Sequence, residues 1–507
     1  MLYQVSFTFI HVSAHVLLYT LPCIVWTLTV RLPVWALSCL GVRLTRDEPR
    51  DEREVHILGP VGCVASSVAA TMRERFGIAE AQLDNPALHR GVPVTTADSV
   101  TPACLRYHGP LYNGHLHTIL GAYRPLPDLR APQRELVPSY DGNPTCLDWW
   151  LPTPAETAAA AAACATAEGV RVRAMVVILP GLTSSSKEFY VRRIAQQLLS
   201  ANMAVCVLNA RGVADTPLEQ PQIFNALFTK DVRYIMENYL TRSKVEERLL
   251  REMLSTEQPD TSKPLPILGL AFSLGGIILT NYVSEQGEAN RESGFDAVYT
   301  VTAPHNPSDS AMALRTLVTG ALYNPHLYSG LRDYYERHKA VVQRLPGINQ
   351  KLLFTGLKPV IEKLRTVQDF DEYVTGPHMG FPGAEAFYSH ANNFRRLHLS
   401  RTPQVCLVAA NDPICGPPQP DALWMDVIEK HRAGLVYVEL PVGGHLGFLG
   451  GPCREWMQAP NEMEKFVLYS MTHFIESANC DYESNAETTV HKAKLNGIGG
   501  ANKKKAA

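Results

Sequence analysis

A lone serine interrupts the apolar stretch from Ile267 to Val283, which has the sequence ILGLAFSLGGIILTNYV. An apolar run that stops at Ser273 and resumes with helical spacing after two glycines predicts a strand, a sharp turn and a helix, with the serine at the apex. A serine on such a turn is exposed and can act as a nucleophile. The simpler alternative is a serine that caps a helix, and the short pattern alone does not separate the two.

Two further residues with catalytic chemistry also follow apolar, strand-like runs. Asp412 follows PQVCLVAAN, and His445 follows LVYVELPVGG. A serine hydroxyl is a poor nucleophile near neutral pH until a histidine takes its proton, and an aspartate can hold the imidazole in the required tautomer. Taken singly, Asp412 before a proline is typical of a turn, and His445 after two glycines is typical of a loop. The order serine, aspartate, histidine, each after a strand, predicts a catalytic triad.

Acyl transfer to a serine also requires hydrogen-bond donors for the negative charge that develops on the carbonyl oxygen. One donor is expected from the backbone N–H of Leu274, which follows the nucleophile, and the second from a loop after an earlier strand. The stretch ILPGLTSSSKEF supplies such a loop, in which Pro180 and Gly181 bend the chain and leave the N–H of Leu182 available. A phosphate-binding loop is the alternative, but the spacing and the Gly-Lys-Ser/Thr ending are missing.

Strand-like and helix-like segments alternate along most of the chain. Apolar runs such as VRAMVVILP, AVCVLNA and AVYTVTAP are separated by helical patterns such as YVRRIAQQLLS and FNALFTKDVRYIMENYL. This alternation predicts an α/β fold with a doubly wound, mostly parallel sheet, in which functional groups follow the carboxyl ends of the strands. The sequence YDGNPTCLDWWLP near Asp141 predicts a β-hairpin. Residues 307–400 interrupt the alternation with helical, aromatic-rich sequence and are predicted to form a lid.

The composition argues against several classes of partner and cofactor. The 507 residues carry a formal net charge of -2, so no excess of charge indicates a nucleic acid as partner. The 11 cysteines are dispersed, with no C-x-x-C pair and no Cys/His cluster at zinc-ligand spacing, which predicts reduced thiols and no metal site. Because the predicted serine mechanism requires neither, we expect no metal and no cofactor.

Residues 1–30 contain no charged side chain and exceed the roughly 20 apolar residues that cross a bilayer. No basic segment precedes them and no clear cleavage site follows, so we expect a single-pass membrane anchor within residues 1–43, with a buried or interfacial helix as the alternative. Arg31, Arg43 and Arg46 follow the run, which predicts that the rest of the chain faces the cytosol. The final NKKKAA resembles a dilysine retrieval signal of the endoplasmic reticulum.

The predicted catalytic domain spans residues 105–478. Residues 44–104 are mixed in composition and receive no assignment, and residues 479–507 form a polar tail that ends in KKKAA. The alanine-rich stretch 157–169 is predicted to be a surface loop inserted before the next strand. We therefore expect one large domain behind an N-terminal anchor.

The sequence resembles a group of membrane-anchored α/β hydrolases that includes mammalian α/β-hydrolase-domain phospholipases, bacterial esterases and yeast medium-chain ethanol acyltransferases. The segments that carry the resemblance are LYNGHLHTIL, ILPGLTSSSKEFYV, VLNARG, AFSLGG, FDEYVTGPHMGF and VAANDPIC. The resemblance implies an α/β-hydrolase fold with Ser273 as nucleophile, Asp412 as acid and His445 as base. Ala271 stands where the group usually has a glycine, and Asn411 stands where it often has a second acidic residue.

These observations predict a membrane-anchored serine hydrolase that cleaves acyl esters of lipids. The resemblance favours glycerolipids or phospholipids as substrates, and the anchor makes the membrane a second partner. Transfer of a medium-chain acyl group to a small alcohol is the alternative among enzymes, and a triad-bearing binding or scaffold protein is the alternative outside them. Phe381, Phe387 and Tyr388 are candidates for lining an acyl groove, although ordinary core packing is the simpler expectation.

Overall fold

The computed structural model describes residues 56–58, 92–93, 113–157, 172–253, 264–348, 364–449, 459–476 and 478, all within the compact unit Arg53–Ala507. The strands are β1 (His56–Leu58), β2 (Val92–Pro93), β3 (Gln133–Pro138), β4 (Pro144–Trp150), β5 (Ala174–Leu179), β6 (Met203–Leu208), β7 (Ile267–Phe272), β8 (Ala297–Val301), β9 (Gln404–Ala409) and β10 (Leu435–Leu440). The main α-helices are α5 (Gly114–Ala122), α7 (Phe189–Ser200), α8 (Lys230–Asn238), α9 (Arg242–Met253), α10 (Leu274–Glu288), α11 (Pro307–Ala313), α12 (Leu317–Val342), α15 (Val367–Phe370), α16 (Gly376–His378), α17 (Ala384–Ala391) and α18 (Asp421–Lys430). A further helix covers residues 462–476.

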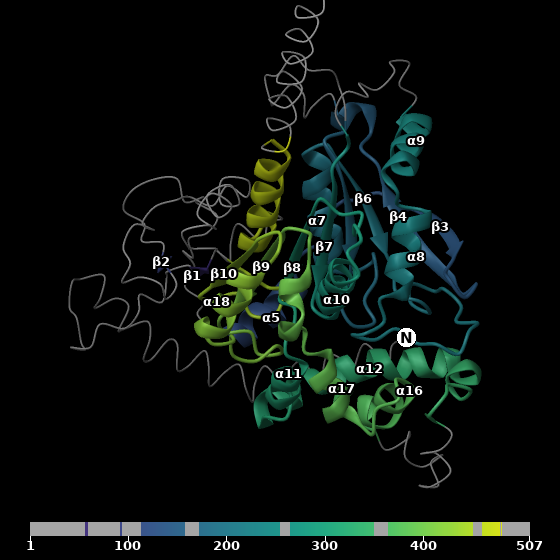
Figure 1. The fold of residues 1–507 in the computed structure, drawn as a ribbon, viewed down its shortest axis with the longest axis vertical. Helices are drawn as coiled ribbons and strands as arrows, with labels where there is room; N and C mark the ends of the chain where they lie inside the picture. The colour runs from purple at the N-terminus through teal and green to yellow at the C-terminus, as the bar shows by residue number, and fades with distance from the viewer. Residues whose placement is uncertain are drawn as a thin grey trace, which may run out of the picture. The chain divides into compact units, whose positions relative to one another are not determined.

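The ten strands in the described part of the chain form one sheet, in the order β2-β1-β10-β9-β8-β7-β5-β6-β4-β3 (Figure 1). The six central strands from β10 to β6 run parallel to their neighbours, whereas β4 pairs antiparallel with β6 and with β3. The prediction of a mostly parallel sheet is therefore confirmed. The hairpin predicted near Asp141 is the β3–β4 pair, whose turn is closed by a 2.8 Å hydrogen bond from the Ser139 N–H to the Asn143 carbonyl oxygen.

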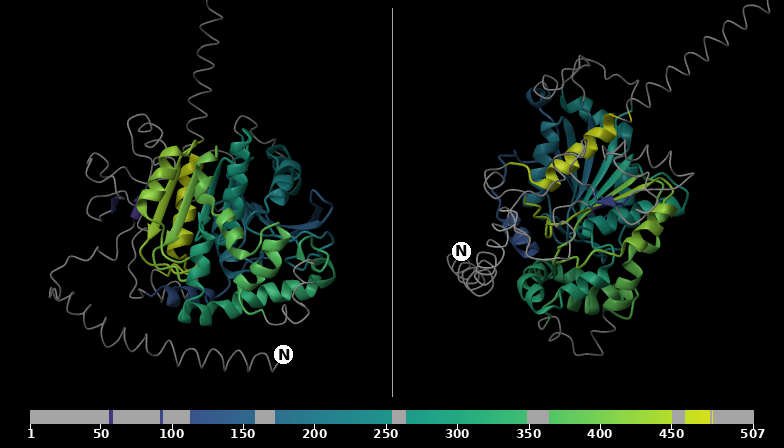
Figure 2. Two further views of the ribbon diagram at one scale, coloured as in Figure 1. Left: turned by 60° about the horizontal axis from the view of Figure 1, so that its bottom comes forward. Right: turned by 90° about the vertical axis from the view of Figure 1, so that its left-hand side faces the viewer.

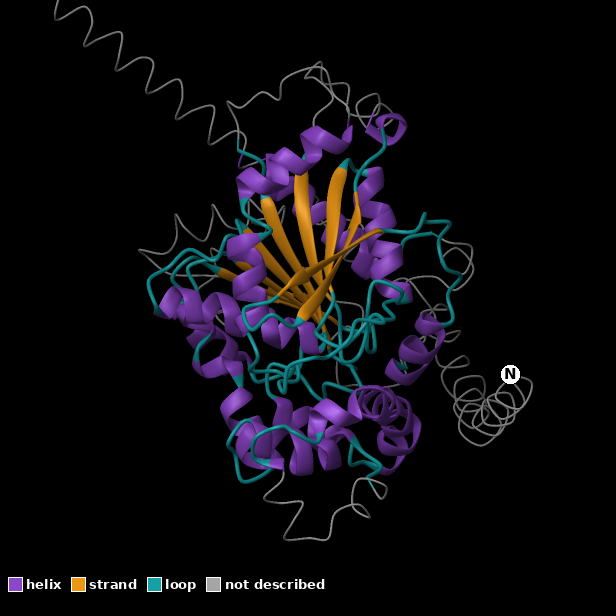
Figure 3. Ribbon diagram, turned by 90° about the vertical axis from the view of Figure 1, so that its right-hand side faces the viewer, coloured by secondary structure: helices purple, strands orange, loops and turns teal. Residues whose placement is uncertain are grey.

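Alternate residues of the central strands pack into core clusters on opposite faces of the sheet. In β5, Val176 and Ile178 belong to the cluster that includes α7 and the helix at residues 462–476, whereas Met175 and Val177 belong to the cluster that includes α8 and α10. Every residue of β5, β6 and β7 is buried. A strand that is covered on both faces must be apolar throughout, which explains why these runs show no polar alternation. Figures 2 and 3 show the sheet between two layers of helices.

The helices between residues 307 and 400 gather at one end of the sheet (Figure 1). They include α11, the 26-residue α12, α15, α16 and α17, and a π-helical turn, η5, at Asp371–Thr375. Side chains from several of these helices line the cavity that also contains Ser273, at the carboxyl end of β7. The region predicted as a lid therefore lies over the candidate site.

The structure corrects one helix boundary. The sequence pattern predicts a helix from residue 224 to residue 240, but α8 begins at Lys230. Phe224 packs edge-on against Tyr334 of α12, and the Asn225 side chain accepts a hydrogen bond from the Leu227 N–H at 2.9 Å, so this stretch turns beneath the lid instead. Contacts with a distant part of the chain override the local helical pattern here.

Two short strands come from the segment 44–104, which has no assignment from sequence. Strand β1 pairs antiparallel with β10, and β2 pairs antiparallel with β1, so they extend the sheet beyond β10. The predictions for residues 1–43 and 479–507, and for nearly all of the alanine-rich stretch, fall outside the described residues. Within the described ranges, the structure contains no helix with both the length and the apolar character needed to span a bilayer.

Arg211, from the VLNARG segment after β6, is fully buried although its guanidinium is charged. Its Nε donates to Asp231 at 2.7 Å, its Nη1 donates to Asp141 at 2.9 Å, and its guanidinium carbon lies 4.6 Å from the centre of the Phe228 ring. Burial alone would raise the pKa of Asp141, but the hydrogen bond and the charge of Arg211 outweigh burial and lower it. This cluster ties the β3–β4 turn to α8.

Arg211→Met is expected to lower the free energy of unfolding by about 3 to 5 kcal/mol, because it leaves the carboxylates of Asp141 and Asp231 without their cation. Chemical denaturation followed by circular dichroism measures the change. Lys187→Met is the matched control, because it breaks an ion pair with Asp215 in which both side chains are exposed, and it should leave stability almost unchanged. Equal stability of the two variants would contradict a structural role for the buried cluster.

Candidate active site

Ser273 lies at the apex of the turn between β7 and α10, with φ 51° and ψ -124°. A positive φ is costly for a residue with a Cβ, so the surrounding chain must hold the serine in place. The Ser273 N–H donates to the carbonyl oxygen of Val301 on β8 at 3.0 Å. A Cβ on Gly275 would lie 2.4 Å from the carbonyl oxygens of Leu179 and Pro180, so only glycine fits at the second position of the helix. The local structure is the strand, turn and helix that the sequence pattern predicts.

The structure brings Ser273, Asp412 and His445 together in one hydrogen-bonded chain. His445 Nε2 lies 3.0 Å from Ser273 Oγ, and His445 Nδ1 lies 2.8 Å from Asp412 Oδ2. The three residues follow β7, β9 and β10, whose carboxyl ends lie at the same edge of the sheet. With its Nδ1 proton held by Asp412, the imidazole presents Nε2 as an acceptor for the serine proton. This arrangement can activate a serine hydroxyl.

The surroundings of Asp412 keep its side chain ionised. The residue is buried, and its Oδ1 accepts hydrogen bonds from the N–H groups of Ile414 at 2.8 Å and Cys415 at 2.9 Å. Burial alone would raise the pKa of Asp412, but the charge and hydrogen bond of His445, together with the two backbone donors, lower it below its ordinary value. The sequence leaves open whether Asp412 forms a turn or pairs with histidine. In the structure it does both, because Oδ1 accepts the backbone N–H groups of the turn and Oδ2 contacts His445.

Two residues without a sequence-based role position the loop that carries His445. Asn411 Oδ1 accepts the N–H groups of Gly443 and Gly444, both at 3.0 Å. On α5, Thr118 Oγ1 accepts the N–H of His445 itself at 2.8 Å. An acidic residue at position 411 would offer the same acceptor, which explains why asparagine is compatible with the site. The Thr118 contact joins residues 327 positions apart, so no local pattern could reveal it.

Asn411→Leu is expected to lower kcat for ester hydrolysis by about 10- to 100-fold, because the loop that aims His445 loses the acceptor of two N–H groups and shifts. Steady-state kinetics on a soluble ester measure the loss. Asn411→Asp keeps an acceptor oxygen at the same place and should retain most of the activity. If the aspartate variant were as impaired as the leucine variant, the acceptor role of Asn411 would be wrong.

Both predicted oxyanion donors lie beside Ser273. Leu274 is the first residue of α10, so its N–H has no partner within the helix. Leu182 follows Gly181, and a Cβ built on Gly181 would lie only 3.2 Å from the Cβ of Ser273. The loop is fixed by a 2.9 Å hydrogen bond from the Gly181 N–H to the hydroxyl of Tyr190. Leu182 and Leu274 also line the same cavity as the serine.

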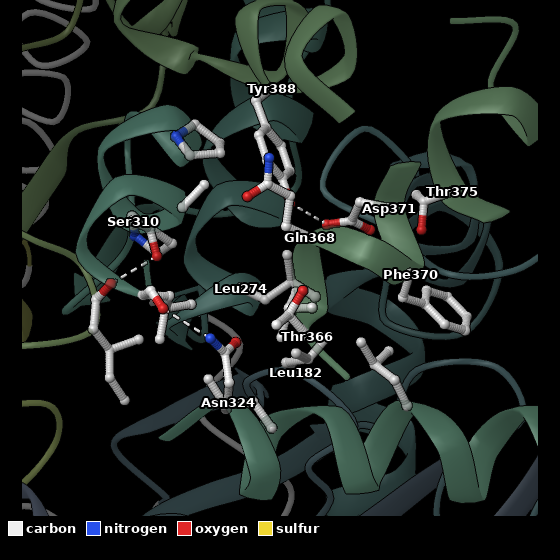
Figure 4. Close-up of a pocket in the computed structure, with 18 of the residues that line it drawn as sticks. Leu182, Leu274, Ser310, Asn324, Thr366, Gln368, Phe370, Asp371, Thr375 and Tyr388 are labelled. Carbon is white, nitrogen blue, oxygen red and sulfur yellow. Dashed lines mark hydrogen bonds between the residues drawn. The ribbon is translucent and has the colours of Figure 1, made fainter. Parts of the chain in front are cut away.

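Ser273 borders a cavity of about 550 Å³ between the sheet and the lid. Figure 4 shows Leu182, Leu274 and Thr366 near the centre of this cavity, with Asn324 of α12 on one side and Phe370 and Asp371 on another. Most of the lining side chains are apolar, which suits a hydrocarbon chain, and a cavity of this size is typical of sites that enclose a small ligand.

The three aromatic residues singled out from sequence all belong to the core beneath the lid, and two of them also reach the cavity. Phe387 and Tyr388 line the cavity and are also members of a buried cluster with Ile277. Phe381 packs against the same cluster but does not line the cavity. Core packing is therefore confirmed for all three residues, and Phe387 and Tyr388 also line the cavity, whereas the acyl groove itself stays a prediction.

Asp371 is an acidic group in the cavity wall, at the start of the π-helical turn Asp371–Thr375. The Tyr388 hydroxyl donates to its Oδ2 at 2.7 Å (Figure 4). Burial raises the pKa of Asp371 to about 6, although hydrogen bonds from Thr375 and Tyr388 oppose part of the rise. The FDEYVTGPHMGF segment, which has no assigned role from sequence, supplies this part of the wall.

One cluster within the described residues has the donor atoms of a metal site. Asp412, Cys415 and His445 place an oxygen, a sulfur and a nitrogen atom within 4.8 Å of one another. The hydrogen bond between Asp412 and His445 already uses two of these residues, so a metal ion there would compete with the serine–histidine–aspartate arrangement. Serine-based chemistry at this site requires no metal.

No protein-family profile matches the sequence. The chain is similar to the monoacylglycerol lipase of Saccharomyces cerevisiae, with 29% identity over 289 residues that cover 56% of this chain and 57% of that protein. It is similar to the medium-chain fatty acid ethyl ester synthase/esterase 2 of the same yeast, with 27% identity over 295 residues that cover 56% of this chain and 59% of that protein. It is also similar to the phospholipase ABHD3 of Mus musculus, with 23% identity over 348 residues that cover 68% of this chain and 74% of that protein. The alignments therefore span less than two thirds of the two yeast proteins.

Proposed function

Because the chain belongs to the α/β-hydrolase family, we propose that it is a serine hydrolase that cleaves acyl esters of lipids. The observation that carries the proposal is the hydrogen-bonded chain from Asp412 through His445 to Ser273, beside a cavity large enough for an acyl chain. The names of the relatives support an ester as the bond that is cleaved.

In the proposed first half-reaction, Ser273 Oγ attacks the ester carbonyl carbon while His445 Nε2 takes the hydroxyl proton. The N–H groups of Leu182 and Leu274 donate to the carbonyl oxygen as it becomes negatively charged, and Asp412 stabilises the imidazolium. His445 then gives its proton to the departing alcohol. The acyl group remains on Ser273 as an ester.

In the second half-reaction, His445 takes a proton from water, and the resulting hydroxide attacks the acyl-serine carbonyl carbon. The bond between the acyl carbon and Ser273 Oγ then breaks, and His445 returns the proton to Oγ, which gives a fatty acid and free Ser273. If a small alcohol replaces water at this step, the same chemistry forms a new ester. Transfer to an alcohol is the second candidate function, because the name of one relative combines a synthase with an esterase.

The test is mass spectrometry of products from a mixed pool of phospholipids, acylglycerols and short esters, with wild type and Ser273→Ala, with and without ethanol. Free fatty acid from one lipid class, absent with the variant, would support the hydrolase and name its substrate. Ethyl esters as the main product at modest ethanol would favour the acyltransferase. If folded wild-type protein failed to react with a fluorophosphonate probe, the enzyme proposal would be overturned in favour of a binding or scaffold protein.

We further propose that residues 1–43, which lie outside the described residues, anchor the protein in the endoplasmic reticulum membrane with the catalytic domain in the cytosol. The charge pattern around the apolar run and the NKKKAA ending support this topology. Protection of the NKKKAA end from protease in sealed microsomes would contradict it.

A further inference from the structure

An apolar patch is exposed at the turn between α11 and α12 of the lid. The exposed fractions are 57% for Met312, 85% for Leu317 and 42% for Val318, and these three residues define the rim patch. Apolar side chains exposed one at a time are ordinary on protein surfaces. Met312 near the end of α11, and Leu317 and Val318 at the start of α12, lie on either side of one short turn, and a group of exposed apolar side chains is a candidate site of interaction.

The rim patch borders the entrance of the cavity that contains Ser273. Leu314, Arg315, Thr316 and Leu317 all line the cavity, so Leu317 contributes to the cavity wall and to the exposed patch at once. At Leu317 the apolar wall of the cavity therefore continues into the rim patch.

The turn is held in this position by hydrogen bonds to fixed parts of the fold. Asn324 of α12 donates to the carbonyl oxygen of Leu314 at 2.8 Å, and the Ser310 hydroxyl donates to the carbonyl oxygen of Ile414 at 2.7 Å. The Ile414 N–H in turn donates to Asp412. Hydrogen bonds therefore connect the turn that carries the rim patch to the loop of Asp412, the candidate catalytic acid.

Two arginines stand at the same entrance. Arg315 and Arg365 both line the cavity and are exposed, and Arg315 Nε donates to the Gln368 side chain at 2.7 Å. The guanidinium group suits phosphate recognition because it offers several N–H donors in a planar fork. The nearby carboxylate of Asp369 caps α15 by accepting the N–H of Thr366, so it is engaged within the protein. Apolar side chains beside arginines match a surface with hydrocarbon beneath a layer of phosphates.

We propose that the rim patch docks on a lipid surface, with Leu317 among the acyl chains and Arg315 at the level of the lipid phosphates. A lipid ester then enters the cavity directly from the bilayer and reaches Ser273 without crossing water. This proposal rests on the proposed function, because it takes the substrate to be a lipid ester. It is a contact with the membrane separate from the predicted N-terminal anchor.

The test compares two ester substrates with the full chain reconstituted in vesicles of phosphatidylcholine and phosphatidylserine. One substrate is a water-soluble short-chain p-nitrophenyl ester, and the other is a long-chain acylglycerol in the vesicles. The variant combines Met312→Asp with Val318→Asp, because neither residue lines the cavity. We expect the rate on the vesicle substrate to fall about tenfold, because charge opposes insertion, while the rate on the soluble ester stays nearly constant.

Leu136→Asp is the matched control, because Leu136 on β3 is 56% exposed, like Met312, but lies outside the lid. It should change neither rate. Arg315→Glu should remove any advantage of phosphatidylserine vesicles over pure phosphatidylcholine vesicles. An unchanged ratio of vesicle to soluble rates in the Met312→Asp, Val318→Asp variant would overturn the proposal, whether both rates fell or neither did.

A second measurement does not depend on catalysis, so it separates failure of the docking surface from failure of the proposed function. Benzoylphenylalanine incorporated in place of Met312 should crosslink to vesicle lipid on illumination, whereas the same group in place of Leu136 should not. Lipid crosslinks without hydrolysis of either ester would support the surface and count against the enzyme. Crosslinks from position 312 to a second copy of the chain, or no lipid crosslinks, would overturn the surface.

Discussion

Ser273→Ala is expected to lower kcat for ester hydrolysis by about 10⁵- to 10⁶-fold, because it removes the atom that forms the bond to the acyl group. His445 Nε2, 3.0 Å from the hydroxyl in the unmodified protein, would have no serine proton to accept. The remaining rate would come from water at a site that still holds the oxyanion donors. The measurement is steady-state hydrolysis of a soluble ester, with labelling by a fluorophosphonate as a second readout.

The same variant should keep its fold, because alanine retains the Cβ of serine and meets the strained φ of 51° at a similar cost. Ser284→Ala is the matched control on the same helix, α10, since the buried Ser284 hydroxyl has no hydrogen-bond partner among the described residues. That control should hydrolyse the ester at nearly the wild-type rate. Substantial turnover by well-folded Ser273→Ala would point to another nucleophile and would end the case for this triad.

The parts of the fold that follow from sequence are those encoded by local patterns. Strands β5, β6 and β7 are buried on both faces, so their apolar runs stand out from the amphipathic helices between them. Ser273, Asp412 and His445 could be selected because each follows such a run, and parallel strands end at one edge of the sheet. The position of each residue after a strand therefore predicts that the three side chains lie close together, as they do in the structure.

The remainder depends on contacts between distant segments. Residues 224–229 carry a helical pattern, but packing of Phe224 against α12 decides their conformation. The contact of Thr118 with the His445 backbone joins α5 to a loop near the other end of the domain. The shape of the cavity likewise arises where the lid meets the sheet, so its lining could not be read from any single stretch.

Asp412→Asn is expected to lower kcat by about 10⁴-fold while leaving the backbone of the site in place. The asparagine oxygen would go on accepting the N–H groups of Ile414 and Cys415, which leaves its NH₂ group facing His445 Nδ1. An NH₂ group donates, so it favours the imidazole tautomer with the proton on Nε2. That tautomer cannot accept the proton of Ser273, and the neutral amide no longer stabilises the imidazolium.

Asn411→Asp is the control, because it replaces an amide with a carboxylate at the neighbouring position. It keeps the side-chain oxygen that accepts the N–H groups of Gly443 and Gly444. Hydrolysis of a soluble ester and the rate of fluorophosphonate labelling should fall together in Asp412→Asn, since both require His445 to take the serine proton. A loss of less than about tenfold would mean that another group orients His445. A normal labelling rate with slow hydrolysis would instead place the defect in the second half-reaction, after the acyl-serine has formed.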